Sequence, residues 1–201
     1  MANPPTTTTR PAAPRRSSPL RTILIVLAIL LLIIGLIILI IWLAFKPKHL
    51  VYSIESGSIR EYNLSDTKHL NTTFNFVIRA YNPNPKLSVY YDKVEAWVSY
   101  DRQKVAYTPV GPFSQPRKNA TDLAVNLVAR DVVLTGDMVR KLKRDRTGGA
   151  VELDVQMKAR IKFKMGKWKS GHRTLKVKCS PVFVRFPPYK SFERKICDVH
   201  T

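Results

Sequence analysis

The chain has 201 residues, of which 34 are Lys or Arg and 14 are Asp or Glu, so its formal charge at neutral pH is +20. One uncharged apolar run at residues 22–45 holds a large share of the hydrophobic residues, a distribution that argues against an ordinary cytosolic enzyme. The remaining residues, 46–201, suffice for one domain with its own core but not for two.

The segment before the apolar run, residues 1–21, is rich in Pro and Thr and contains no acidic residue. Because such a composition cannot bury enough apolar surface, the sequence predicts a disordered tail. Its Arg-Arg-Ser-Ser-Pro stretch at residues 15–19 has two interpretations. We favour a signal for membrane topology over a phosphorylation site that lowers the positive charge beside the membrane.

The apolar run at residues 22–45 contains neither a charge nor a Pro, and it predicts a transmembrane helix. At 1.5 Å per residue it reaches about 36 Å, against about 30 Å for the hydrocarbon core of a bilayer. The run is longer than the apolar part of a cleaved signal peptide and lacks a small-residue cleavage site. We therefore expect an uncleaved single-pass anchor.

Two kinds of feature that are typical of secreted domains, glycosylation sequons and paired cysteines, occur in this chain after the apolar run. Three glycosylation sequons begin at Asn63, Asn71 and Asn119. The two cysteines, Cys179 and Cys197, lie 18 residues apart, and a bridge between them would stabilise the fold by about 3 kcal/mol. Two free thiols are the alternative. Together with a slight excess of Arg before the run, these features predict a cytosolic N-terminus and an extracellular domain.

Downstream of residue 48, apolar and polar residues alternate, which is typical of half-buried β-strands. The alternation is clearest from Val151 to Met165, where every odd position is apolar and every even position is polar. Further strands are predicted at residues 72–80, 94–100, 105–110, 123–134 and 175–179. One helix is predicted at residues 135–145, before Gly148 and Gly149, and residues 111–116 are predicted to be a loop. About seven antiparallel strands indicate a β-sandwich.

The sequence offers no recognisable catalytic, cofactor or metal site. Its four His residues are scattered, and none has a second ligand at metal spacing. The sequence lacks a phosphate-binding Gly-rich loop, a nucleophile elbow and a His-Glu-x-x-His motif. We therefore predict a protein that is not an enzyme and needs no cofactor; the alternative would require a cleft with convergent titratable groups.

Basic residues concentrate between residues 140 and 178. Four of them take every second position of the strand predicted at residues 151–165 and so point the same way, and two more lie on the next strand. The six candidate anion-binding residues are Lys158, Arg160, Lys162, Lys164, Lys176 and Lys178. Anionic lipid or acidic cell-wall polysaccharide would neutralise them. A solvated face that discourages aggregation is the interpretation we weigh more heavily, and nucleic acid is not expected as a partner.

Three segments of the chain resemble one plant family. They are FNFVIRAYNPNPKLSVYYD at residues 74–92, GPFSQPRKNAT at residues 111–121 and KVKCS at residues 176–180. The most specific part is Asn82-Pro83-Asn84 followed by Tyr90-Tyr91-Asp92. With its basic tail and single span, the chain resembles the plant harpin-induced-like and non-race-specific disease resistance-like proteins. These are membrane-anchored members of the late-embryogenesis-abundant group with a hydroxyproline-rich glycoprotein label.

The resemblance implies a fibronectin III- or immunoglobulin-like sandwich with one helix, at the plasma membrane or plasmodesmata, without enzymatic activity. It implies roles in pathogen defence, the hypersensitive response and stress tolerance, with the bilayer and defence-signalling membrane proteins as expected partners. A purely structural, stress-protective module is the second hypothesis. We interpret the Asn-Pro-Asn motif as a turn that ends a strand rather than as a ligand contact. The charged C-terminal residues predict no lipid anchor.

Overall fold

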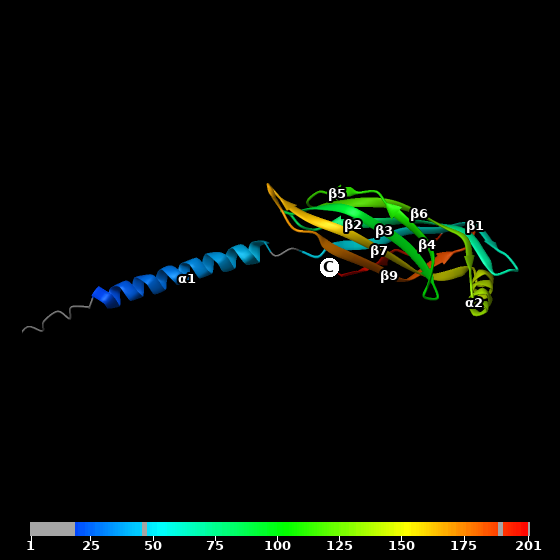
Figure 1. Ribbon diagram of the computed structural model, residues 1–201, viewed down its shortest axis with the longest axis horizontal. Coiled ribbons are helices and arrows are strands. Elements are labelled where there is room, and N and C mark those ends of the chain that lie inside the picture. The colour runs from blue at the N-terminus through cyan, green and yellow to red at the C-terminus, as the bar shows by residue number, and fades with distance from the viewer. Residues whose placement is uncertain (1–18, 46–47, 189–190, 201) are drawn as a thin grey trace, which may run out of the picture. The chain divides into compact units, whose positions relative to one another are not determined.

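The computed structural model describes residues 19–45, 48–188 and 191–200, so most of the tail predicted at residues 1–21 lies outside the described residues. The chain divides into two compact units, with the boundary in the sequence between residues 46 and 47. The first contains the helix α1 (Pro19–Phe45), and the second contains all the strands and the helix α2 (Gly136–Thr147). Figure 1 shows both units.

The helix α1 begins at Pro19, three residues before the predicted span. Pro suits the first turn of a helix because the N–H that it lacks would have no partner there. The described apolar side chains of α1 are exposed, with Leu32 for example 69% accessible. Among the described helices, α1 alone is long and apolar enough to cross a membrane. It is therefore consistent with a membrane anchor or a signal sequence.

The second unit is an antiparallel sandwich of two sheets, which confirms the predicted fold class. The first sheet has the order β10-β1-β2-β6. Its strands are β1 (Val51–Leu64), β2 (His69–Asn82), β6 (Asn119–Val133) and β10 (Lys195–Ile196). The second sheet has the order β11-β9-β7-β3-β4, with β5 paired to β3 and β8 paired to β7. Its strands are β3 (Ser88–Tyr100), β4 (Gln103–Val110), β5 (Phe113–Gln115), β7 (Ala150–Met165), β8 (Trp168–Lys169), β9 (Arg173–Arg185) and β11 (Asp198–His200).

The core lies between the two sheets, and the period of two predicted for residues 151–165 decides which side chains enter it. The odd-numbered residues of β7 from Val151 to Ile161 are buried, whereas Lys158 and Arg160 are exposed. The opposite sheet contributes Ile54, Phe76 and other apolar side chains. Because successive residues of a strand point to opposite faces, burying one set presents the basic set to solvent.

The helix α2 covers one end of the sandwich, away from β5 (Figure 1). Thr135 is its N-cap and accepts a hydrogen bond from the Met138 backbone N–H at 3.3 Å, as expected of Ser and Thr at this position. Met138 and Leu142 are buried, so the thin apolar stripe is sufficient to dock the helix on the sandwich. Gly148 ends the helix, in agreement with the sequence prediction.

Several strands of the sandwich were not predicted from the sequence. No strand was predicted at β1, because register shifts between Ile54 and Ser56 and between Arg60 and Asn63 interrupt its alternation. A Cβ atom at Gly57 within this strand would lie 2.7 Å from the Phe192 ring, so a larger residue would require that ring to move. The predicted loop at residues 111–116 was wrong in part, since it contains β5. The short strands β8, β10 and β11 carry too few residues for a periodic signal.

Candidate anion-binding surface

All six predicted basic residues lie on the solvent side of the second sheet. Lys158, Arg160, Lys162 and Lys164 alternate with buried or partly buried residues of β7. On the neighbouring strand β9, Lys176 lies directly opposite Lys158 in the register. The sheet therefore places like charges side by side, an arrangement that costs stability unless an anion or an acidic side chain compensates it.

The middle of this surface already has such compensation. Glu95 of β3 lies opposite Lys158 in the register, and its Oε1 is 3.4 Å from the Nζ of Lys93. Nearby, Asp92 Oδ2 lies 3.5 Å from His172 Nε2. The carboxylates of Glu95 and Asp92 thus pair with Lys93 and His172, while Arg160 lies opposite Lys93 in the register. Because charges of both signs mix in this region, it is a weaker candidate for binding an anion than a site lined by cations alone.

The end of the surface is different, because Lys162 and Lys164 line a pocket of about 620 Å³. The pocket lies between the beginning of β3, the strand β5 and the hairpin of β7 and β8. Its five cationic residues are Lys86, Arg117, Lys162, Lys164 and Lys169. None of the described residues that line it is Asp or Glu. We call these five residues and the space between them the basic pocket; they make it the strongest candidate anion site in the described part of the chain.

Three of the five cations were not among the sequence candidates. Lys86 lies between β2 and β3, Arg117 between β5 and β6, and Lys169 in β8. The one local signal is that Lys86 and Arg117 each follow a Pro at a predicted turn. Only the folding of these turns to the same end of the sandwich shows that their charges converge on Lys162 and Lys164.

The family motif holds the walls of the basic pocket in place. The fully buried Asn82 donates from Nδ2 to the Leu87 carbonyl at 2.8 Å and to the Pro116 carbonyl at 3.0 Å. Its Oδ1 accepts from the Asn84 backbone N–H at 3.1 Å. Asn84 in turn donates from Nδ2 to the Lys48 carbonyl at 2.9 Å. These contacts favour the structural interpretation of the motif, because both Asn side chains are occupied by the backbone.

The two tyrosines of the motif face opposite sides of β3. Tyr90 is 43% exposed and lines the basic pocket, whereas Tyr91 is buried between the sheets. The Tyr91 hydroxyl is hydrogen-bonded to that of Tyr52 on β1 and donates to Gln115 Oε1 at 3.0 Å. This buried contact joins the two sheets.

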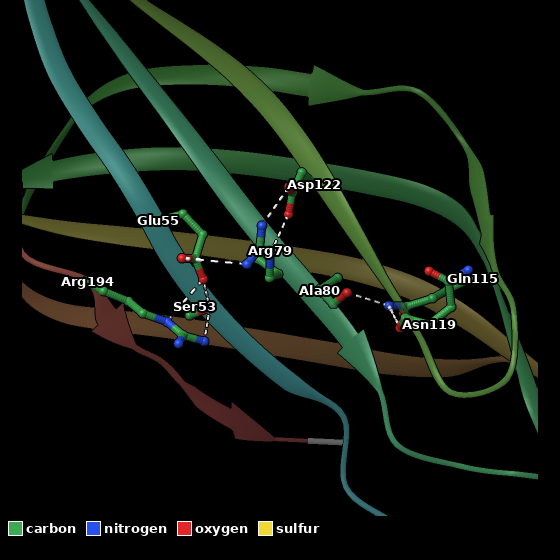
Figure 2. Close-up of polar contacts among 8 residues, drawn as sticks. All are labelled: Ser53, Glu55, Arg79, Ala80, Gln115, Asn119, Asp122 and Arg194. Carbon is green, nitrogen blue, oxygen red and sulfur yellow. Dashed lines mark hydrogen bonds and ion pairs between the residues drawn. The ribbon is translucent and has the colours of Figure 1, made fainter.

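Gln115 completes the link between the sheets. Its Nε2 donates to the Ala80 carbonyl at 2.5 Å and to the Asn119 carbonyl at 3.1 Å. Figure 2 shows Gln115 reaching from its strand to these two carbonyls of the opposite sheet. Because Gln115 also lines the basic pocket, the same side chain fixes the sandwich and the pocket wall.

The buried tyrosines make the stability sensitive to alkaline pH. Burial raises the pKa of Tyr91 to about 12 and that of Tyr52 well above its ordinary value of 10.0, and the neighbouring Tyr91 hydroxyl adds to the rise at Tyr52. The Tyr100 pKa is also raised, first by burial and then by its hydrogen bond to Asp145.

We expect the free energy of unfolding to fall as the pH rises from 10 toward 12. The unfolded chain then releases protons that the folded chain still holds, so deprotonation favours unfolding. The stabilisation from each buried tyrosine is fully present below pH 10. Above pH 10 it falls by about 1.4 kcal/mol per pH unit. Urea unfolding at a series of pH values measures this slope. The slope of the free energy of unfolding against pH should be shallower for a Tyr91→Phe variant and unchanged for Tyr107→Phe, an exposed control. Equal slopes for the wild type and both variants would contradict the role given to Tyr91.

The outer face of the other sheet carries paired charges. Arg79 Nε lies 2.7 Å from Asp122 Oδ1, and Arg194 Nε lies 3.0 Å from Glu55 Oε1 (Figure 2). The hydrogen bond from Arg79 lowers the pKa of Asp122. Because these pairs are exposed and mutually satisfied, we interpret them as surface structure and not as a binding site.

Two further sets of predicted residues have clear positions. Cys179 on β9 and Cys197, between β10 and β11, form a disulfide that ties the C-terminal strands to the sandwich. Asn63, Asn71 and Asn119 are all exposed. Among the described residues, no group of three or more His, Cys, Asp or Glu side chains could hold a metal ion.

The fold and surface define a class of protein: a mainly β sandwich with one helix, preceded by an apolar helix. The family described as "Late embryogenesis abundant protein" matches residues 77–179, and the chain belongs to this family. Three relatives from Arabidopsis thaliana support the assignment. "Uncharacterized protein At1g08160" is 34% identical over 186 residues, which cover 91% of this chain and 84% of the relative.

The other two relatives carry a common name. "NDR1/HIN1-like protein 3" is 34% identical over 149 residues, covering 72% of this chain and 64% of the relative. "NDR1/HIN1-like protein 26" is 26% identical over 170 residues, covering 81% of this chain and 80% of the relative. These matches confirm the resemblance to the harpin-induced-like and non-race-specific disease resistance-like proteins, a plant defence and stress family.

Proposed function

We propose that the protein is a membrane-anchored plant protein without enzymatic activity, whose extracellular sandwich acts in defence, including the hypersensitive response, and in stress signalling. One observation carries this proposal: the same chain contains an exposed apolar helix and a domain of the NDR1/HIN1-like family. The anchor crosses the plasma membrane once, with the N-terminus in the cytosol. The proposed localisation includes the plasma membrane at plasmodesmata. Defence-signalling membrane proteins are its proposed partners.

Two features support the extracellular side. A disulfide between Cys179 and Cys197 is stable in an oxidising compartment and is rare in the cytosol. Asn63, Asn71 and Asn119 are exposed, so each can accept a glycan without disturbing the core. Together with the apolar helix, these features support the proposed membrane anchor and the proposed orientation.

Endoglycosidase treatment and protease protection test the topology. On intact protoplasts we expect external protease to remove the sandwich, while alkaline carbonate leaves the anchored protein in the membrane. Endoglycosidase should shift the electrophoretic band of the wild type, and a variant with Asn63, Asn71 and Asn119 all replaced by Gln should show no shift. A protected sandwich and an unshifted wild-type band would place the domain in the cytosol and refute the proposed topology.

A second candidate function is that of a structural, stress-protective module that binds anionic lipid or acidic cell-wall polysaccharide through the basic face. The observation that favours it is the placement of Lys158, Arg160, Lys162, Lys164, Lys176 and Lys178 on one side of the sheet.

Reversing charges on this face tests the second candidate. We expect Arg160→Glu combined with Lys162→Glu to weaken retention on pectin or on anionic vesicles by about tenfold at low salt, because repulsion replaces attraction. The matched control reverses two exposed cations of α2, Lys143→Glu with Arg144→Glu, and should retain more of its binding. Equal retention of all three proteins across a salt series would remove this function.

A further inference from the structure

A tight hairpin beside the basic pocket exposes a tryptophan. β7 and β8 pair through Lys164 with Lys169 and Met165 with Trp168, so only Gly166 and Lys167 form the turn. Gly166 has a φ of 56°, the left-handed value that such two-residue turns require and that Gly adopts without strain. Trp168 is 56% exposed. The hairpin thus holds a large apolar ring in solvent between cationic side chains.

This hairpin lies at the end of the sandwich where the chain enters the domain. Ser88 at the start of β3 pairs with Lys164, and Val51 at the start of β1 pairs with Tyr81 at the end of β2. The entering segment is fixed there because the Lys48 backbone N–H donates to Asn84 Oδ1 at 2.7 Å. Lys48 and Leu50 also line a small cavity together with Phe163 of β7 and Arg173 of β9, which places the entry point beside the base of the hairpin.

The covalent chain limits how far this end can be from a membrane that α1 spans. Lys48 follows Phe45 by three residues, so their Cα atoms are separated by at most about 11 Å. The headgroup layer on each side of a bilayer is about 5 to 7 Å thick. The short tether therefore keeps Lys48 itself close to the lipid headgroups.

The side chains at this end match the chemistry of an anionic membrane surface. Arg117, Lys162, Lys164 and Lys169 supply N–H donors and positive charge for lipid phosphates. Trp favours the interface between headgroups and acyl chains, since its ring is apolar and its N–H seeks a polar partner. A largely exposed Trp flanked by Lys167 and Lys169 fits this interface.

We propose that the basic pocket and the β7–β8 hairpin dock the sandwich onto anionic lipid of the same membrane that anchors the chain. Trp168 enters the interface, and the pocket cations contact lipid phosphates. This inference rests on the anchor of the proposed function and selects lipid as the ligand of the basic surface. Acidic polysaccharide is the less fitting occupant, because the pocket lies at the end of the sandwich where the chain enters and the exposed ring beside it is apolar.

Fluorescence of the full chain in proteoliposomes tests the docking. A Trp42→Phe background leaves Trp97 and Trp168, and the further change Trp168→Phe gives the signal of Trp97 alone. With brominated lipids as quenchers, we expect Trp168 to be quenched in bilayers containing phosphatidylserine and much less in pure phosphatidylcholine. Lys162→Glu with Lys164→Glu should lower the ratio of docked to undocked protein by at least about thirtyfold, whereas Lys143→Glu with Arg144→Glu should keep the quenching.

The possible outcomes separate this inference from the proposed anchor. If the protein does not float with neutral vesicles, the anchor itself fails. If it floats but Trp168 is unquenched, or is quenched equally in neutral and anionic bilayers, the docking proposal is overturned. A third outcome also overturns it. Trp168 would stay unquenched, and the protein in neutral bilayers would bind polygalacturonate and lose that binding in the variant with Lys162→Glu and Lys164→Glu. The ligand of the pocket would then be an acidic polysaccharide.

Discussion

Replacing Gln115 by Leu is expected to lower the free energy of unfolding by about 3 to 5 kcal/mol. Gln115 is fully buried, and its side chain makes three hydrogen bonds, with the Tyr91 hydroxyl and the carbonyls of Ala80 and Asn119. Leu has a similar volume but no polar atoms. The variant would therefore leave two carbonyls without this partner in the interior, and the cost of unsatisfied buried groups exceeds the modest gain from a more apolar side chain.

Urea unfolding followed by circular dichroism measures this loss. Gln103→Leu is a suitable control, because Gln103 makes a single hydrogen bond to the Val133 carbonyl in an exposed position. Its free energy of unfolding should change by less than about 1 kcal/mol. A Gln115→Leu variant as stable as the control would show that the link between the sheets contributes little to the fold.

Removing the disulfide is expected to cost about 3 kcal/mol. The bond between Cys179 and Cys197 closes a loop of 18 residues, and the unfolded chain gains the corresponding entropy when the bond is absent. Both residues are buried, so Cys179→Ala with Cys197→Ala avoids placing a new hydroxyl in the interior. We expect the strands β10 and β11 to lose protection first, since they have only two and three residues.

Hydrogen exchange and denaturant unfolding together check this result. The double variant should unfold at a lower denaturant concentration than the oxidised wild type and should not respond to dithiothreitol. Reduction of the wild type should reproduce the midpoint of the variant. An oxidised wild type with the same midpoint as the variant would show that the bond does not stabilise the fold.

Gln115 and the disulfide stabilise different parts of the sandwich. Gln115 lines the basic pocket and joins the sheets, while the disulfide holds the strand β11 against β9 next to Lys176 and Lys178. The contacts of Gln115 fix the backbone that forms one wall of the basic pocket. Preorganised cations bind an anion more strongly than mobile ones, because less side-chain entropy is lost on binding.

Much of the fold follows from local pattern. The alternation in residues 151–165 predicted the buried face of β7, and Thr135 with Gly148 marked the ends of α2. Where local pattern is interrupted, prediction fails. Bulges and Gly57 obscured β1, and the three residues of β5 were too few to distinguish from a loop.

The candidate site was predictable only along one strand. Lys158, Arg160, Lys162 and Lys164 share a face because their spacing equals the period of a strand. The structure then separates them: Glu95 of β3 lies opposite Lys158, whereas Lys162 and Lys164 line the basic pocket. That separation depends on which residues of other strands lie opposite, and strand register is set by the whole sandwich.

The amino-acid sequence by itself determined the apolar helix, the alternating strands, the family and the excess of positive charge, because each depends on composition or on neighbours a few residues apart. Only the tertiary structure decided that Lys86, Arg117 and Lys169 join Lys162 and Lys164 in one pocket. It also decided that an exposed Trp168 lies at the end where the chain enters. These facts depend on segments distant in the sequence, which packing and strand pairing bring together.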